Sequence, residues 1–307
     1  MKKATYIIIA LAVLAGLTIL IRQSSPQKKT TNEEKLVVGA TIFPLYDITR
    51  NIGGDYVSVV NILPPGASPH TFEPMPSTIK SLQRAKAVFA VGHGLDNWVN
   101  QIAESIPGLS EYIVDSGITL QKSHEEEDEH GNEEADAFDP HYWLDVHNAK
   151  IIDQNIADKL VELDPAHADA YRANLRRYQG NLDALQAELS EHMAPYAGQD
   201  IITFHDGWFY FADAFQLTIA GVFEPSPGKE PTPRYLESLQ TAAEEKDIKT
   251  VFSEPQFSNE TLKPFIKDLG LSLSVLDPLG GVVDRDSYIG LMRYNVDTIA
   301  NALYASR

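Results

Sequence analysis

Short apolar segments alternate with amphipathic segments along most of the chain. The first apolar segment, LVVGATIF at 36–43, has the character of a buried strand, and the helical pattern after Pro44 runs to Gly53 and Gly54. Three more segments of this kind follow at 56–63, 87–92 and 112–115. Strands that alternate with helices in this way predict a parallel, doubly wound sheet.

The second half repeats this alternation after one long amphipathic segment. Strands are predicted at 200–204, 217–223, 249–254 and 271–277, with helical patterns between them. The long segment carries an apolar stripe at steps of three and four: Tyr171, Leu175, Tyr178, Leu182, Leu185, Leu189 and Met193. We therefore predict an α/β fold of two (β/α) lobes with parallel sheets, joined by a long, rigid backbone helix.

The predicted domain boundaries follow these changes of pattern. Residues 36–163 form an N-terminal α/β lobe, 164–196 the linking helix and 197–307 a C-terminal α/β lobe. Within the first lobe, 122–137 contains the run HEEEDEHGNEEAD and is expected to be a solvated acidic loop.

The N-terminus has a different character from the lobes. Lys2 and Lys3 precede an apolar run from Tyr6 to Ile21, and Arg22 follows it. Residues 1–22 are predicted to be an uncleaved membrane anchor, with a cleaved signal segment as the alternative, and 23–35 a polar tether. Lysines on the near side of the apolar run place the body of the protein outside the cytoplasm.

Composition narrows the classes of ligand. The net charge of -18 argues against a nucleic-acid partner, because phosphate binding needs clustered Lys and Arg, and it favours a cationic partner. The chain has no cysteine, so a disulfide framework, a thiolate zinc site and a lipid-modified cysteine are all excluded. A bound transition metal would depend on His, Asp and Glu.

Four such residues follow predicted strands or precede predicted helices. His70 lies in the loop after the second strand, His141 in the loop after the acidic run, His205 directly after the strand at 200–204, and Asp277 at the end of the last strand. The carboxyl ends of parallel strands face the ligand crevice of such a sheet, so these side chains are predicted to converge in the cleft between the lobes. Three imidazoles and one carboxylate suit Zn²⁺, whereas Mn²⁺ prefers more oxygen ligands.

A closed set of four protein ligands is typical of a carrier and not of a hydrolase, which needs an open position for water. Asp145, Asp206 and Glu73 are the nearest acidic residues that would accept hydrogen bonds from the imidazoles. Each proposed ligand also has a purely structural interpretation. His70 and His141 could be solvated loop residues, His205 a residue at the edge of the core, and Asp277 a turn former.

Four ordered motifs resemble the metal-binding solute-binding proteins of bacterial ABC importers, the zinc and manganese group. They are LPPGASPHTFEPMPSTIKSLQRAKAVFAVG at 63–92, DPHYWLDVHNAKIIDQNIADKL at 139–160, TFHDGWFYFADAFQL at 203–217 and VFSEPQFSNETLKPFIKDLGLSLSVLDPLGG at 251–281. The resemblance runs from about residue 36 to the C-terminus.

The resemblance implies two lobes linked by a long helix, a metal ion held between them, and delivery to a membrane permease. It assigns ligand positions to His70, His141, His205 and Asp277; manganese members usually carry a glutamate at the position of His205. It also implies a metal-collecting role for the acidic loop, but this loop has only His124 and His130, so a plain linker remains the alternative.

The function predicted is therefore an extracytoplasmic zinc-binding component of an ABC importer, acting as a monomer and catalysing no reaction. No HExxH, Gly-rich phosphate loop or G-x-S-x-G motif is present in the sequence. The alternatives are a manganese or iron carrier of the same fold, a membrane-anchored zinc hydrolase, and a surface adhesin or metal sensor.

Overall fold

The computed structural model describes residues 34–123, 138–224, 231–258 and 260–305, and Lys35–Arg307 form one compact unit. The predicted anchor, most of the tether and most of the acidic loop, including His124 and His130, lie outside the described residues. Within the described ranges, no helix is both long enough and apolar enough to cross a membrane.

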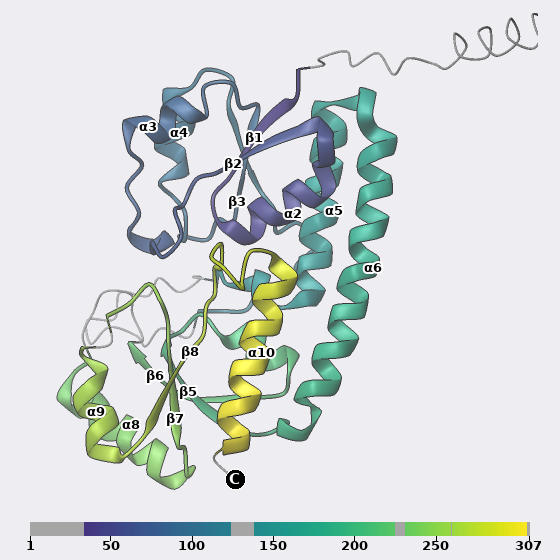
Figure 1. Ribbon diagram of the computed structural model, residues 1–307. Coiled ribbons are helices and arrows are strands. Elements are labelled where there is room, and N and C mark those ends of the chain that lie inside the picture. Colours follow the sequence, from purple (N-terminus) through teal and green to yellow (C-terminus); the bar gives the residue numbers. More distant parts are fainter. Residues whose placement is uncertain (1–33, 124–137, 225–230, 259, 306–307) are drawn as a thin grey trace, which may run out of the picture. The chain divides into compact units, whose positions relative to one another are not determined.

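Two four-stranded sheets form the centres of the two lobes (Figure 1). All neighbouring strands are parallel. In the N-terminal lobe the order is β2-β1-β3-β4 and in the C-terminal lobe it is β6-β5-β7-β8, so the second sheet repeats the first. The strands are β1 (Leu36–Ala40), β2 (Val57–Asn61), β3 (Ala87–Ala90), β4 (Ser110–Ile113), β5 (Asp200–His205), β6 (Thr218–Glu224), β7 (Thr250–Ser253) and β8 (Ser272–Val275).

Helices connect the parallel strands and cover the sheets. The N-terminal lobe contains α2 (Phe43–Gly53), α3 (Pro76–Ser81) and α4 (Val99–Ser105), and the C-terminal lobe contains α7 (Phe209–Ala214), α8 (Pro233–Glu245), α9 (Leu262–Leu269) and α10 (Tyr288–Ala305). Two further helices, α5 (Val146–Leu163) and α6 (Ala168–Met193), come between the strands of the two lobes in the sequence. The predicted fold class, two α/β lobes with parallel sheets and a long helix, is confirmed.

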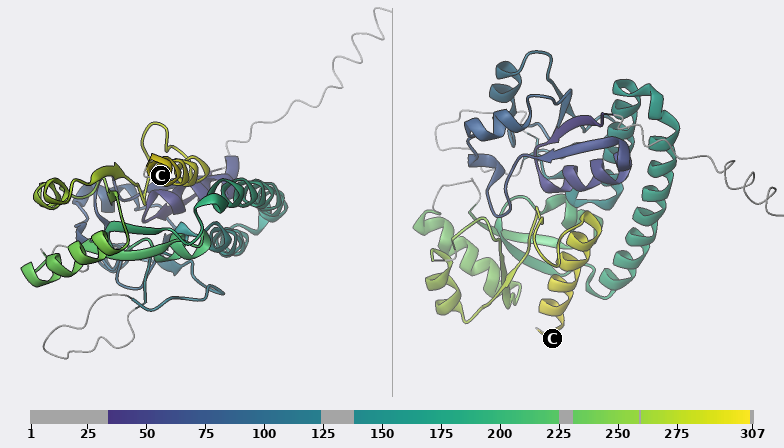
Figure 2. Two further views of the ribbon diagram at one scale, coloured as in Figure 1. Left: turned by 90° about the horizontal axis from the view of Figure 1, so that it is seen from below. Right: turned by 45° about the horizontal axis from the view of Figure 1, so that its top comes forward.

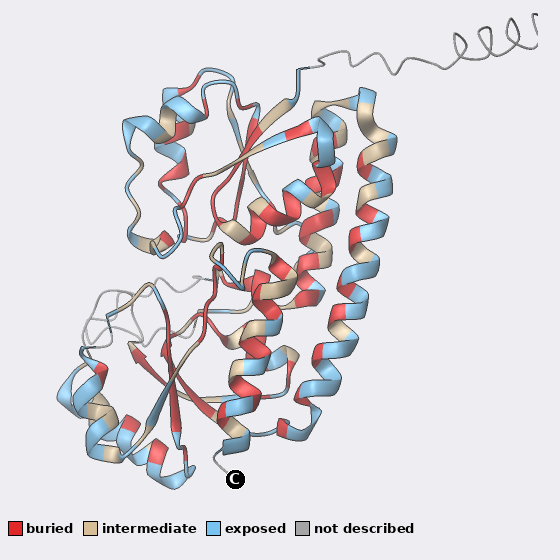
Figure 3. Ribbon diagram, in the orientation of Figure 1, coloured by how far each residue is buried: buried red, intermediate tan, exposed pale blue. Residues whose placement is uncertain are grey.

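Helix α6 spans both lobes. Its 26 residues correspond to roughly 39 Å at 1.5 Å per residue. The seven residues of the predicted apolar stripe are the seven that are buried on it, and they face α2, α5 and α10 (Figures 1 and 3). Seen nearly end-on in Figure 2, α5 and α6 stand side by side. Bending α6 would therefore expose this stripe and break backbone hydrogen bonds.

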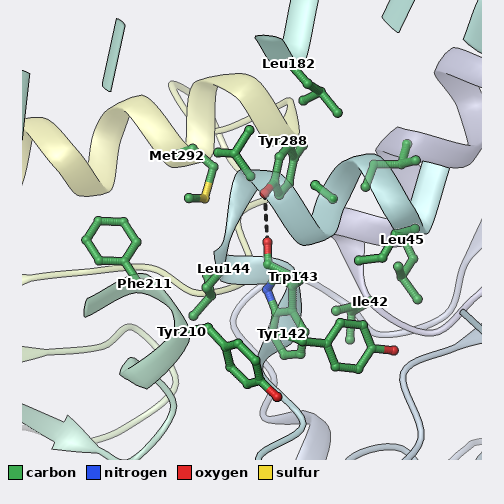
Figure 4. Close-up of a cluster of buried hydrophobic side chains, with 14 of the residues drawn as sticks. Ile42, Leu45, Tyr142, Trp143, Leu144, Leu182, Tyr210, Phe211, Tyr288 and Met292 are labelled. Atoms are coloured by element: carbon green, nitrogen blue, oxygen red, sulfur yellow. Dashed lines mark hydrogen bonds between the residues drawn. The ribbon is translucent and has the colours of Figure 1, made fainter. Parts of the chain in front are cut away.

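A continuous core joins the two lobes. Trp143, in the short helix η3 (Tyr142–Leu144), donates from its indole Nε1 to the carbonyl oxygen of Pro278 at 2.8 Å. The Tyr288 hydroxyl donates to the carbonyl oxygen of Trp143 at 2.8 Å (Figure 4), and the Tyr288 amide donates to Asp47 Oδ2 at 2.9 Å. Trp143 and Tyr288 are fully buried. Buried polar bonds of this kind hold the lobes in one relative position.

One buried carboxyl group of this core lacks a complete set of hydrogen bonds. Asp153 on α5 accepts at Oδ1 from Gln179 Nε2 on α6 at 3.0 Å, while its Oδ2 has no hydrogen-bond partner within the described residues. Burial raises the pKa of Asp153 to about 7, with only partial opposition from Gln179 and the backbone. The native state therefore prefers this carboxyl in its neutral form.

We expect Asp153→Asn to make the free energy of unfolding less dependent on pH. A raised pKa in the folded state means that the free energy of unfolding falls as pH rises from about 4 to about 7 and stays low above that range. The substitution should stabilise the protein at pH 8 by on the order of 2 kcal/mol and have little effect near pH 4. Urea unfolding across this pH range measures it. Asp158→Asn, at an exposed position of α5, is the control, and equal pH dependence in wild type and Asp153→Asn would contradict the assignment.

Candidate metal centre

Three of the four predicted ligands converge between the lobes. His70 belongs to the short helix η2 (Pro69–Thr71) that follows β2, His141 directly precedes η3, and His205 is the last residue of β5. One ring nitrogen from each lies within 4.8 Å of the others. His141 and His205 are buried and His70 is half-buried. The N-terminal lobe thus supplies two imidazoles and the C-terminal lobe one.

The distance between two of these nitrogens matches the distance expected between two ligands of a tetrahedral ion. His141 Nε2 and His205 Nε2 are 3.3 Å apart. Two nitrogens bound to one tetrahedral Zn²⁺, at 2.0–2.1 Å each, would be separated by about 3.3 to 3.4 Å. His70 Nε2 is buried and makes no hydrogen bond within the described residues. Its ring centroid lies 5.4 Å from that of His141 and 6.1 Å from that of His205.

Two buried carboxylates orient the rings of His141 and His205. Asp139 Oδ1 accepts from the backbone amide of His141 at 2.9 Å and faces its ring Nδ1 at 2.8 Å. Glu254 Oε1 lies against His205 Nδ1 and accepts from Trp208 Nε1 at 2.9 Å. A proton held on Nδ1 by a carboxylate leaves the Nε2 lone pair free to bind a metal ion.

These carboxylates differ from those predicted from sequence. Asp145 instead caps α5 by accepting from the amide of His147 at 2.8 Å, and Glu73 is exposed. Asp139 stands two residues before His141, so the sequence D-P-H already indicated a carboxylate close to this ligand. Glu254 follows β7, which pairs with β5 in the sheet, and this strand pairing brings it to His205 across 49 residues of sequence.

Burial and neighbouring charges set the protonation of the three imidazoles. Burial, helped by His141 and His205, lowers the pKa of His70 to about 2. Burial and the neighbouring His205 likewise lower the pKa of His141 well below its usual range. Burial also disfavours protonated His205, but the adjacent carboxylate of Glu254 outweighs it and the pKa of His205 is raised. His70 and His141 are therefore neutral at physiological pH, as metal ligation requires.

The cavity beside the imidazoles is small. Its volume is about 10 Å³, which corresponds to one water-sized sphere. Besides the three histidines, its lining includes Pro69, Trp143, Phe257, Pro278 and Leu279. The space thus admits one atom among walls that are largely apolar.

Asp277, the predicted fourth ligand, lies outside the three-histidine group. Its Oδ1 accepts from the backbone amides of Leu279 at 3.0 Å and Gly280 at 2.9 Å. Its Oδ2 lies 3.5 Å from Arg285 Nε. Coordination by Asp277 would require Oδ2 to turn toward the cavity, so its role as a ligand stays a prediction.

The other histidines of the described ranges are not part of this group. His93 lies between Gly92 and Gly94 with a left-handed φ of 52°, and its Nε2 lies 2.7 Å from Asp115 Oδ2. His147 is exposed and His167 is half-buried.

We expect Asp139→Asn and Glu254→Gln each to lower zinc affinity by about 10- to 100-fold, because an amide holds the imidazole N–H less firmly than a carboxylate. Competition against a chromophoric zinc chelator measures the change. Glu260→Gln, which alters an exposed surface ion pair, should leave affinity unchanged. Wild-type affinity in both site variants would show that these carboxylates do not support the ligands.

Gly207 packs against the ligand imidazoles. A Cβ atom on Gly207 would lie 2.6 Å from His205 Nε2 and 3.0 Å from His141 Cδ2, closer than side chains tolerate. The absence of a side chain at this position therefore keeps the coordination space open.

Gly207→Ala should accordingly reduce zinc affinity by at least about 10-fold, because the added methyl displaces an imidazole from its position. Gly180→Ala is the matched control, since nothing lies within 4 Å of a Cβ at that exposed position of α6. It should bind zinc normally and gain about 0.5 to 1 kcal/mol of stability. Calorimetric titration of both variants, with circular dichroism to verify folding, provides the comparison. Equal affinities would rule out a steric role for Gly207.

Comparison with known proteins finds that this chain is similar to components of metal transporters. A family model described as "Zinc-uptake complex component A periplasmic" matches residues 38–302. The metal ABC transporter substrate-binding lipoprotein ScbA of Streptococcus cristatus is 30% identical over 316 aligned positions, which cover 99% of each chain. The manganese ABC transporter substrate-binding lipoprotein PsaA of Streptococcus pneumoniae is 29% identical, with 98% of this chain and 99% of PsaA covered.

Solved structures with the same fold are similar to this chain throughout. A crystal structure of ZnuA superposes with a TM-score of 0.78 at 30% identity, covering 88% of this chain and 99% of that one. The Mn²⁺ complex of the protein FpvC from Pseudomonas aeruginosa also gives 0.78, at 28% identity, with 89% and 100% covered.

Proposed function

Because this chain belongs to the family of periplasmic zinc-uptake components, we propose that it captures Zn²⁺ and delivers it to the membrane permease of an ABC importer. The observation that carries the proposal is the meeting of three imidazoles, from two lobes, at one cavity of atomic size. The relatives are named as transporter components, in agreement with the prediction that this chain catalyses no reaction.

The choice of zinc over manganese rests on the chemistry of the site. Several relatives are named for manganese, and FpvC is described with Mn²⁺. In this chain the converging atoms are nitrogens, which suit Zn²⁺, whereas Mn²⁺ favours a larger set of oxygen ligands. A cavity of about 10 Å³ is small for an ion that keeps several water ligands. We propose that Asp277 completes the set when the ion is bound.

The rigid connection between the lobes determines how the ion is captured. The stripe of α6 and the bonds of Trp143 oppose a wide hinge motion, so capture and release proceed through movements of the ligand-bearing loops. We place the chain outside the cytoplasm, acting as a monomer, with its N-terminal apolar segment as the proposed tether to the membrane.

We expect the purified protein to bind one Zn²⁺ and to prefer it over Mn²⁺ in a competition titration monitored by calorimetry. His141→Ala should weaken zinc binding by about 100-fold or more, because it removes a ligand and leaves a buried gap. His147→Ala, which changes an exposed histidine, is the control. Preference for Mn²⁺ would overturn the choice of metal, and unchanged zinc binding by His141→Ala would overturn the site.

A further inference from the structure

The loop after β8 places the side chain of Arg285 beside the carboxylate of Asp277. The Gly281 amide donates to the carbonyl oxygen of Arg285 at 2.8 Å, and the Arg285 amide donates to that of Val282 at 3.0 Å. These bonds close a tight turn in which Asp284 has a left-handed φ of 70°. Val283 is exposed on this turn, and Arg285 sits at its base with a side chain that is 19% exposed. The turn thus fixes where the guanidinium lies.

The contact between Arg285 Nε and Asp277 is long. Arg285 Nε lies 3.5 Å from Asp277 Oδ2, longer than the roughly 2.7 to 2.9 Å of a charge-assisted hydrogen bond, and this nitrogen makes no hydrogen bond within the described residues. The guanidinium carbon lies 4.4 Å from the ring centroid of Tyr294 on α10. If Asp277 turned away, the cation would keep the face of Tyr294 and its access to solvent.

Asp277 is fixed everywhere except at Oδ2. Asn295 Oδ1 accepts from its backbone amide at 2.9 Å, and Asn295 Nδ2 donates to its carbonyl oxygen at 2.7 Å. The amides of Leu279 and Gly280 hold Oδ1. Pro278 and Leu279, the two residues after Asp277, line the cavity of the three imidazoles, while Oδ2 of Asp277 faces Arg285.

We propose that Arg285 acts as an internal competitor of the captured cation: it holds the Asp277 carboxylate away from the three imidazoles and must give it up when the metal ion binds. This inference rests on the proposed function, since it names the regulation of the same site. Three neutral imidazoles carry no charge to balance a dication, so binding Asp277 is favourable for the ion. Separating the Asp277 carboxylate from Arg285 costs free energy, and this cost offsets part of the gain from binding the ion. Arg285 therefore weakens metal binding and speeds release toward the permease without contacting the ion.

The test compares Arg285→Gln with wild type in two backgrounds, using Zn²⁺ alone and a chromophoric chelator. Removal of the competing cation should tighten zinc binding by about 10-fold, or roughly 1.4 kcal/mol, and slow dissociation in stopped-flow measurements. In the Asp277→Asn background the same substitution should change neither quantity, because there is no carboxylate to compete for. Arg285→Lys keeps the charge and should stay close to wild type.

Several outcomes overturn the proposal. Unchanged or weaker zinc binding by Arg285→Gln would contradict competition, and an equal effect in both backgrounds would show that Arg285 acts without Asp277. An Asp277→Asn protein with wild-type affinity would remove the carboxylate from the site altogether. Arg293→Gln, on the exposed side of α10 and paired with Glu188, controls for the loss of an arginine. If Arg285→Gln fails to fold, Arg285→Lys with tenfold tighter binding would contradict the role of charge, and wild-type binding would support it.

These measurements distinguish a failure of the role of Arg285 from a failure of the proposed function. Failure of wild-type protein to bind zinc would defeat the function itself. Zinc binding that is lost in His141→Ala, but unaffected by Arg285→Gln, would keep the function and reject the competitor.

Discussion

The convergence of three histidines depends on the two lobes being held at one separation. Trp143 provides this constraint, since its indole donates to Pro278 in the C-terminal lobe while its own carbonyl accepts from Tyr288. The ring of Trp143 also lies against His141, with 5.3 Å between centroids. The loop that presents one ligand is thus bonded to the loop that follows Asp277. Together with the bond from Tyr288 to Asp47 and the packing of α6, this link fixes His205 relative to the histidines of the other lobe.

The site also depends on the protonation of its imidazoles and on the carboxylates beside them. Burial keeps His70 and His141 neutral, which leaves their lone pairs available, and the carboxylates of Asp139 and Glu254 hold a proton on Nδ1 of His141 and His205. Negative charge is therefore present behind His141 and His205. A dication entering this environment meets lone pairs in front and carboxylates behind, and the same arrangement would repel an anion.

Much of this architecture was accessible from the sequence. Periodicity identified the strands, and the step of three and four identified the buried face of α6, because these patterns report local geometry. His70, His141 and His205 were predicted because each lies where a parallel sheet presents its carboxyl edge or in a recognisable motif. The order of the strands was not predictable in this way, since it depends on how the crossovers pack.

The features that sequence missed are relations between distant residues. Glu254 reaches His205 only through the pairing of β5 with β7, and Gly207 matters only because two imidazoles pack against its backbone. The side-chain orientation of Asp277 is likewise decided by Leu279, Gly280 and Arg285, and no periodic pattern encodes a rotamer. Such contacts arise from tertiary packing, which local propensity does not record.

The size of the cavity has a consequence for which ions can reach the ligands. Space for a single atom means that a hydrated ion must shed its water before it enters, and the walls of Pro69, Phe257 and Leu279 offer nothing to replace that shell. Mg²⁺ parts with its water reluctantly and prefers six oxygens, so its abundance gives it little advantage here. The cost of dehydration therefore disfavours strongly hydrated ions at this site, in addition to the preference of the imidazoles for a borderline metal.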